Sequence, residues 1–273
     1  GNDILYDESQ IEQGRNFGNK IWNAFRLITG WTVDASLEQS DACEVAVKWF
    51  GNKLNAVAAE VNDHFAKFRI SDALMAVYKF FWDDFCAWYL ELVKPAYGSP
   101  IDAKTYEATL EFFEDLLKMI HPIMPFITEE LWHAVRERGE NETIMFERYP
   151  VAGESDAEYV AAFGLATEVV AGIRNIRQQK GLSPREPFKA YFVGDFSEEM
   201  WPVVVKLANI SEIQHVTSID ESLAGVSFMA GGVAKSGRSL VLGRNSCDSG
   251  HNSLTLHPFN REPDILHVVS PCP

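Results

Sequence analysis

The chain has 273 residues, a formal net charge of −15 at pH 7 and a hydrophobic content of 47%, with 18 Phe and 7 Trp. This composition is typical of a globular protein that buries a sizeable core without metals or disulfides, and it excludes a disordered chain. The acidic balance argues against a nonspecific nucleic-acid binder, which would carry positive charge over most of its surface, but it permits a local basic groove.

The first predicted element is an amphipathic helix over residues 14–28. Its apolar stripe, at helical spacing, consists of Phe17, Ile21, Ala24, Phe25 and Ile28. The opposite arc carries Arg15, Asn16, Asn19, Lys20, Asn23 and Arg26, with Trp22 and Leu27 at its two edges. No acidic residue occurs between Glu12 and Asp34. Because cations suit phosphates and asparagine suits base edges, the face is either a nucleic-acid contact or a solvated surface that happens to be basic.

Further helices are predicted from the apolar period at residues 41–68, 72–93, 105–120 and 128–138. The expected caps or first residues are Asp41 or a neighbour, Ser71, Thr105 and Thr128, and the expected stops are Pro95 and Gly139. Residues 72–93 are apolar almost all round, which predicts the central helix of a bundle.

Two groups of polar residues in these helices could carry chemistry. Asp83 and Asp84 are adjacent in the central helix, but neighbouring helix positions point about 100° apart. Pairing with Lys or Arg of a neighbouring helix is therefore favoured over acid–base catalysis. His121 and His133 lack a third ligand in the sequence around them, which favours packing or surface roles over a metal site.

The second half of the chain changes period. After a linker at residues 141–155 and a helix at 156–179, the pattern predicts a strand, a helix and two strands at residues 187–193, 197–209, 212–217 and 225–229. Arg174, Arg177, Lys180 and Arg185 form a second basic group, which is either a phosphate contact or a solvated helix end. Residues 230–273 show no sustained period, so we expect them to be irregular or not native to the protein.

Motifs of a self-sufficient enzyme are missing from the sequence. It contains no P-loop, GxGxxG after a strand, GxSxG or HExxH motif. The four cysteines have no CxxC spacing, so we expect neither a metal nor a disulfide framework, in keeping with a reducing cytoplasm. No apolar run reaches the roughly 18 residues of a membrane span, and no signal peptide is recognisable. The sequence indicates a folded binding module.

Four segments together resemble the C-terminal part of class I valyl-tRNA synthetases. GRNFGNKIWNAFR is similar to the first helix of their anticodon-binding domain, SDALMAVYKFFWDDFCAWYLELVKP to its central helix, HPIMPFITEELW to the segment that closes the bundle, and EVVAGIRNIRQQKGLSP to the helix before a small α/β portion. The resemblance covers roughly residues 1–229. It implies a mainly α fold: a helical-bundle anticodon-binding domain of the class Ia type at 1–150, a helix with a small α/β subdomain at 151–229, and an irregular tail at 230–273.

The family's catalytic signatures, an HxGH-type motif and a KMSKS-type loop, do not occur in this sequence. The resemblance therefore implies a fragment of a valine–tRNA ligase that begins past the active site and is inactive alone, with no cofactor of its own. ATP and Mg would belong to the missing catalytic half. The implied partners are tRNA(Val) and the missing catalytic and editing domains, with no membrane and no DNA.

The family's C-terminal helical arm has no counterpart after residue 229. Our hypothesis for residues 230–273 is a frameshift. It predicts that the genomic sequence near codon 230 reads, in another frame, into a Lys-, Glu- and Leu-rich helix. Absence of such a frame would refute the hypothesis.

In the family, an Arg followed by an aromatic residue reads the anticodon near the end of the first helix. Arg26 matches the Arg, whereas Leu27 replaces the aromatic residue. We therefore expect tRNA contacts from Arg26, Leu27, Asn23, Asn19, Lys20, Arg15 and Trp22, and backbone contacts from Arg174, Arg177, Lys180 and Arg185. For Trp22, packing against the bundle is the favoured alternative.

Two other functions stay open on the sequence alone. One is a helical scaffold that binds protein and no RNA, which the acidic surface supports. The other is the equivalent fragment of an isoleucyl-tRNA synthetase.

Overall fold

The computed structural model describes residues 7–139, 141–179, 181, 183, 188–193, 196–215, 226–228 and 239–243. The chain forms two compact units, residues 1–157 and residues 158–273. Within the described residues, every helix is too short or too polar to cross a membrane.

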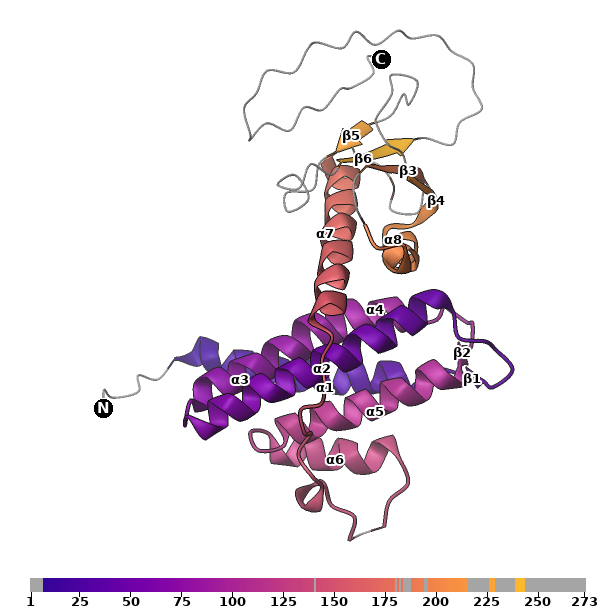
Figure 1. The fold of residues 1–273 in the computed structure, drawn as a ribbon. Coiled ribbons are helices and arrows are strands. Elements are labelled where there is room, and N and C mark those ends of the chain that lie inside the picture. The colour runs from indigo at the N-terminus through magenta and orange to yellow at the C-terminus, as the bar shows by residue number, and fades with distance from the viewer. Residues whose placement is uncertain are drawn as a thin grey trace, which may run out of the picture. The chain divides into compact units, whose positions relative to one another are not determined.

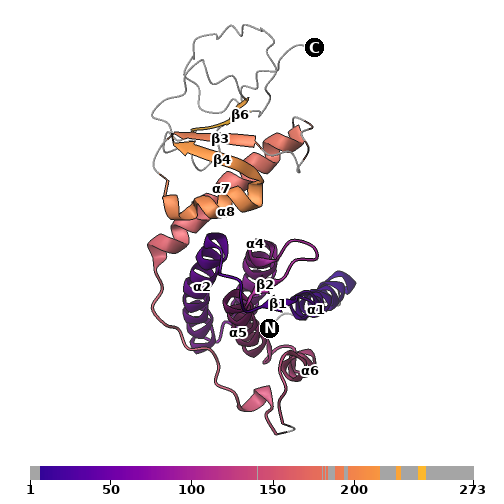
Figure 2. The ribbon, with the colours of Figure 1, turned by 90° about the vertical axis from the view of Figure 1, so that its right-hand side faces the viewer.

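The first unit is a helical bundle (Figure 1). Its elements in chain order are α1 (Glu8–Thr29), β1 (Val33–Asp34), α2 (Asp41–Ala66), α3 (Ile70–Lys79), the π-helix η1 (Phe80–Tyr89), α4 (Leu90–Val93), β2 (Ile101–Asp102), α5 (Ala103–Ile120), α6 (Pro125–Val135) and the 3₁₀ turn η2 (Ile144–Phe146). Strands β1 and β2 form a short parallel pair. In Figure 2, α1 and α2 lie on opposite sides of the bundle with α4 and α5 between them, and α6 lies beside α1.

The central helix predicted at residues 72–93 is confirmed, since α3, η1 and α4 follow one another without a break from residue 70 to residue 93. Aromatic side chains form its core contacts. The rings of Phe50 (α2) and Phe80 stack with centroids 4.8 Å apart and an angle of 8° between their planes. The Tyr89 hydroxyl shares a buried hydrogen bond of 2.8 Å with the Thr109 hydroxyl of α5, so this buried polar group is satisfied.

The π-helical stretch η1 is a feature that the sequence does not predict. A π-helical turn holds more residues than an α-helical turn, which changes the direction in which successive side chains point. Its aromatic rings contact three neighbouring helices: Phe81 contacts Phe17 of α1, Phe80 contacts Phe50 of α2, and Phe85 contacts Phe113 of α5. The segment that reads as apolar almost all round is therefore buried on several sides.

Helix starts differ from prediction where several capping residues compete. The prediction of Ser71 as a cap is wrong, because α3 begins at Ile70 after Arg69 and has no capping side chain. The prediction of Thr105 is also wrong, because Asp102 caps α5 and accepts a 2.7 Å hydrogen bond from the Thr105 backbone N–H. A carboxylate at this position satisfies a free N–H and also lies favourably at the positive end of the helix.

The start of α6 is set by proline. It begins at Pro125, ahead of the predicted Thr128, because proline has no N–H to leave unpaired in a first turn. Thr128 is buried inside the helix and donates its hydroxyl hydrogen to the Met124 carbonyl at 2.9 Å. The helix ends at Val135 and does not extend to Gly139.

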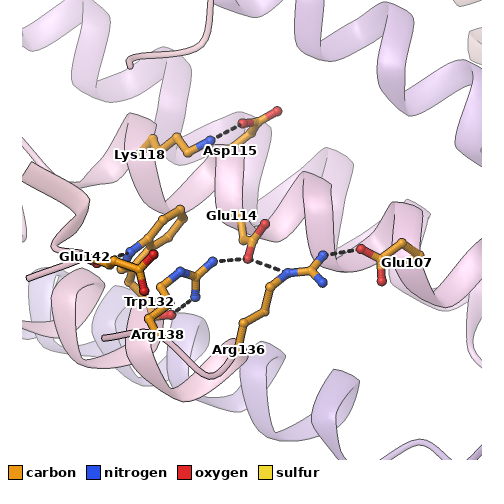
Figure 3. Close-up of polar contacts among 8 residues, drawn as sticks. All are labelled: Glu107, Glu114, Asp115, Lys118, Trp132, Arg136, Arg138 and Glu142. Carbon is orange, nitrogen blue, oxygen red and sulfur yellow. Dashed lines mark hydrogen bonds and ion pairs between the residues drawn. The ribbon is translucent and has the colours of Figure 1, made fainter. Parts of the chain in front are cut away.

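Glu114 of α5 lies between two arginines that follow α6 (Figure 3). Arg136 Nε donates to Glu114 Oε1 at 2.8 Å, and the same guanidinium pairs with Glu107. Arg138 pairs with the same Glu114 oxygen, donates to the Trp132 carbonyl, and lies 3.6 Å above the Trp132 ring centroid. The side chains of Glu114 and Arg138 are only 12% and 11% exposed. This cluster joins α5 to the end of α6.

The second unit holds most of α7 (Ala157–Gln179) and a mixed sheet. The other elements are β3 (Phe188–Val193), the 3₁₀ turn η3 (Glu198–Met200), α8 (Trp201–Ala208), β4 (Ile210–His215), β5 (Val226–Phe228) and β6 (Ser239–Gly243). The strand order is β4-β3-β6-β5. β3 is parallel to β4 and antiparallel to β6, which is antiparallel to β5. The two helices and three strands predicted at residues 156–229 correspond to α7 and α8 and to β3, β4 and β5.

Strand β6 corrects the prediction for the tail. It lies within residues 230–273, which we expected to be irregular, yet Leu240 is in register with Phe192 of β3 on one side and with Phe228 of β5 on the other. This part of the tail therefore belongs to the sheet. The rest of residues 230–273 lies outside the described residues.

Candidate nucleic-acid interface

The amphipathic character of α1 is confirmed. The side chains of Phe17, Ile21, Ala24 and Ile28 are 5%, 0%, 5% and 1% exposed, and Phe25 is half-buried. On the opposite side, the exposed residues are Arg15, Asn16, Asn19, Asn23 and Arg26, while Lys20 is half-buried. The face without an acidic residue is therefore presented on the surface of the first unit.

Three neighbouring elements, α3, η1 and α6, hold α1 with this face outward. The Phe17 ring packs against Tyr78 of α3 and Phe81 of η1, with centroid distances of 4.9 and 5.6 Å. Gly18 lies against α6, where a side-chain carbon in its place would come within 3.4 Å of Met124. Because these contacts involve the buried stripe or its edge, the polar arc other than Lys20 stays exposed.

Arg26 and Arg15 present guanidinium groups at opposite ends of this face. Arg26 is in the last turn of α1 and, among the described residues, has neither an ion pair nor a side-chain hydrogen bond. Arg15 lies 3.7 Å from Glu12, but both side chains are well exposed, at 70% and 62%. Such a surface pair contributes little, so it does not commit Arg15 to this partner.

Two partly exposed apolar side chains lie along the edges of the face. Trp22 is 40% exposed and Leu27 is 41% exposed. The Trp22 ring contacts Phe25 at a centroid distance of 5.8 Å, so it packs against its own helix while much of its surface stays accessible. Both side chains thus offer flat or apolar surface next to Arg26.

The residues of the second basic group, defined above, differ in their surroundings. Arg177 is only 4% exposed, and its guanidinium donates to the carbonyls of Ser183, Ala208 and Asn209 at 2.9 to 3.1 Å. The expectation that Arg177 contacts RNA is therefore corrected: it cross-links its own unit. Arg174 is exposed and donates to the Leu207 carbonyl at 3.1 Å. Lys180 and Arg185 lie outside the described residues.

The carboxylate and histidine groups have structural partners. Asp84 pairs with Lys53 of α2 at 3.8 Å, which confirms for Asp84 the predicted pairing with a cation of a neighbouring helix, whereas Asp83 is exposed. Burial raises the pKa of the Asp84 carboxyl to about 6. His121 Nδ1 lies 2.7 Å from the Thr128 hydroxyl, and His133 Nε2 lies 3.1 Å from Glu129 Oε1. The first histidine contact joins the end of α5 to α6, and the second joins neighbouring turns of α6.

Comparison with known proteins identifies the class of protein. Residues 47–192 match the anticodon-binding domain of tRNA ligase. The match runs from α2 to β3 and covers more than half of the chain, which therefore belongs to this family. Helix α1, with the candidate face, precedes the matched segment.

Three of the chain's relatives are named valine–tRNA ligases. The chain is 50% identical to the valine–tRNA ligase of Parabacteroides distasonis over 230 residues, 48% identical to that of Porphyromonas gingivalis over 231 residues, and 36% identical to that of Fusobacterium nucleatum over 238 residues. These alignments cover 84%, 85% and 81% of this chain but only 26%, 26% and 27% of the relatives. The chain thus spans about a quarter of the length of the ligases it matches.

Proposed function

We propose that this chain is the tRNA(Val)-binding part of a valine–tRNA ligase and that α1 contacts the anticodon stem-loop. The observation that carries the proposal is the exposed, cationic and amide-rich face of α1 in a chain of net charge −15 that belongs to the anticodon-binding family. The names of the relatives support valine over isoleucine.

The α1 face offers the groups that single-stranded RNA recognition needs. Bases of a loop can be splayed out, stacked on flat or apolar side chains and hydrogen-bonded at their edges. Arg26 presents a planar fork for a base edge or a phosphate, and Asn19 and Asn23, one turn apart, present amides on the same side. Leu27 and Trp22 supply the neighbouring apolar surface.

Phosphate contacts would position the RNA without reading its sequence. Arg15 and Lys20 in the first unit are suited to this role. Arg174 in the second unit is an exposed cation, and Lys180 and Arg185 stay predictions.

The attachment of valine would take place elsewhere in the complete ligase. We propose that its catalytic portion, which would bind ATP and Mg, works in the cytoplasm on the tRNA that this chain holds. The chain itself, lacking HxGH- and KMSKS-type motifs, should show no valine-dependent ATP–pyrophosphate exchange. Measurable exchange would refute this division of labour.

The binding test is a fluorescence anisotropy titration with labelled tRNA(Val). Substitution Arg26→Ala should weaken binding roughly tenfold or more, since one bidentate or stacking contact contributes ~1–3 kcal/mol. Arg148→Ala is the matched control, because it removes an exposed arginine from another part of the first unit. Equal affinities of wild type and Arg26→Ala would remove Arg26 from the interface.

Competition separates the alternative functions. Unlabelled tRNA(Val) should displace the probe at lower concentration than tRNA(Ile). The reverse order would indicate an isoleucyl-type fragment, and no saturable binding at low or moderate salt would favour a protein scaffold.

A further inference from the structure

One edge of the polar face of α1 contacts a residue that lies far away in the sequence. The ammonium group of Lys20 lies over the Trp82 ring of η1, with Nζ 5.2 Å from the ring centroid. Trp82 stacks on Tyr78, with centroids 5.6 Å apart and planes at 22°, and Tyr78 packs against Phe17 of α1 at 4.9 Å. Phe17, Tyr78, Trp82 and Lys20 thus form a continuous connection from α1 to the central helix and back.

This connection fixes the one cation of the α1 face that is half-buried. No carboxylate of the described residues pairs with Lys20. An ammonium over an indole is attracted by the electron-rich ring face, and tryptophan is the best aromatic partner for it. A lysine side chain otherwise samples many rotamers, and holding it in one position lowers the entropy cost of each contact it makes.

We propose that Trp82, stacked on Tyr78, is a positioning residue that holds Lys20 in place to bind an RNA phosphate beside the α1 face. The proposal rests on the proposed function and adds the central helix to the interface. Trp82 acts through Lys20: the Tyr78 ring and the Lys20 ammonium both lie against the indole. A base stacking directly on Trp82 is the competing role that the test must separate.

The test measures tRNA(Val) binding across a salt titration from roughly 50 to 200 mM. A lost phosphate contact lowers the slope of log K against log salt by about 0.7 for single-stranded RNA and about 0.9 for a duplex. Lys20→Ala and Trp82→Leu should each lower the slope by up to this amount, with affinity falling roughly three- to tenfold at low salt. Trp82→Phe should keep most of the salt slope and most of the affinity, because it retains an aromatic ring.

A double variant decides between the two roles of Trp82. If Trp82 acts through Lys20, Trp82→Leu has no further effect in the Lys20→Ala background. A full additional loss there, with an unchanged slope, would overturn the proposal in favour of direct stacking. An unchanged slope for Trp82→Leu alone would also overturn it.

Folding and the proposed function have separate controls. Thermal unfolding by circular dichroism checks each variant, and if Trp82→Leu does not fold, Trp82→Phe provides the same comparison with a smaller expected loss. If wild-type protein fails to bind tRNA(Val), the proposed function fails. If wild type binds and Arg26→Ala weakens binding while both Trp82 variants match wild type, only the role of Trp82 fails.

Discussion

The partly buried carboxyl of Asp84 makes the stability of the bundle pH-dependent. Burial raises its pKa from 3.8 to about 6, although Lys53 at 3.8 Å opposes this shift. The folded state therefore binds the proton more tightly than the unfolded chain. The stabilising contribution is complete below pH 3.8 and is lost as the pH rises through 6. At neutral pH the ionised carboxylate is a cost to folding.

The size of the effect follows from the same values. The difference between 3.8 and about 6 corresponds to roughly 3 kcal/mol, since one pKa unit is about 1.4 kcal/mol. The side chain of Asp84 is 24% exposed, so solvent screening is limited. Asp84→Asn, which resembles the protonated form, should raise the unfolding free energy at pH 7.5 by about 1–3 kcal/mol and change it little at pH 4.

Urea unfolding followed by tryptophan fluorescence provides the assay, because Trp22, Trp31, Trp49, Trp82, Trp88 and Trp132 all lie in the first unit. The matched control is Glu38→Gln, which removes an exposed carboxylate from another part of the first unit. A loss of stability in Asp84→Asn that is equal at pH 7.5 and pH 4 would refute the reasoning. It would mean that the Lys53 contact outweighs the cost of burial.

Three further outcomes are expected. Glu114→Gln should destabilise the first unit by about 2–4 kcal/mol in urea unfolding, because it leaves Arg136 and Arg138 without their shared buried carboxylate. The control is Glu91→Gln, which breaks the exposed pair with Lys94 and should cost under about 1 kcal/mol. Arg177→Met should destabilise the second unit by about 1–3 kcal/mol, because it leaves the buried carbonyl of Ala208 unpaired. It should leave the salt dependence of tRNA binding unchanged. Leu27→Phe should tighten tRNA(Val) binding roughly three- to tenfold through added stacking surface, measured by anisotropy.

The periodic features of this fold could be predicted from the sequence. The buried stripe of α1, the central helix and the pairing of Asp84 with a lysine of a neighbouring helix all follow from helical spacing and from the cost of burying a charge. Exact helix starts do not follow, because Asp102 and Thr105 are both good caps and only the folded chain decides between them. Strand β6 was missed because its pattern is short and its pairing partner β3 lies far upstream.

Contacts between distant segments explain what sequence reasoning missed at the candidate site. Lys20 and Trp82 lie on different helices, and no local spacing in the sequence indicates that the Lys20 ammonium lies over the Trp82 ring. The inward direction of Arg177 depends on the carbonyls at the end of α8, which offer hydrogen-bond acceptors that α7 alone does not reveal. A basic residue at a helix end therefore carries the same sequence signal whether it binds RNA or closes its own unit.

The acidity of the chain sharpens the case for α1 as the RNA contact. A net charge of −15 repels the phosphate backbone over most approaches, so nonspecific binding is unfavourable. On α1, Arg15, Lys20 and Arg26 occur without an acidic residue between Glu12 and Asp34, which makes this face a local exception. Binding would then be favourable mainly in the orientation that places RNA on α1, and repulsion elsewhere adds specificity without further contacts. Removing acidic residues remote from α1 would reduce this repulsion, so it should increase the binding of noncognate tRNA more than that of tRNA(Val). Salt screens repulsion as well as attraction, so the difference should be largest at low salt.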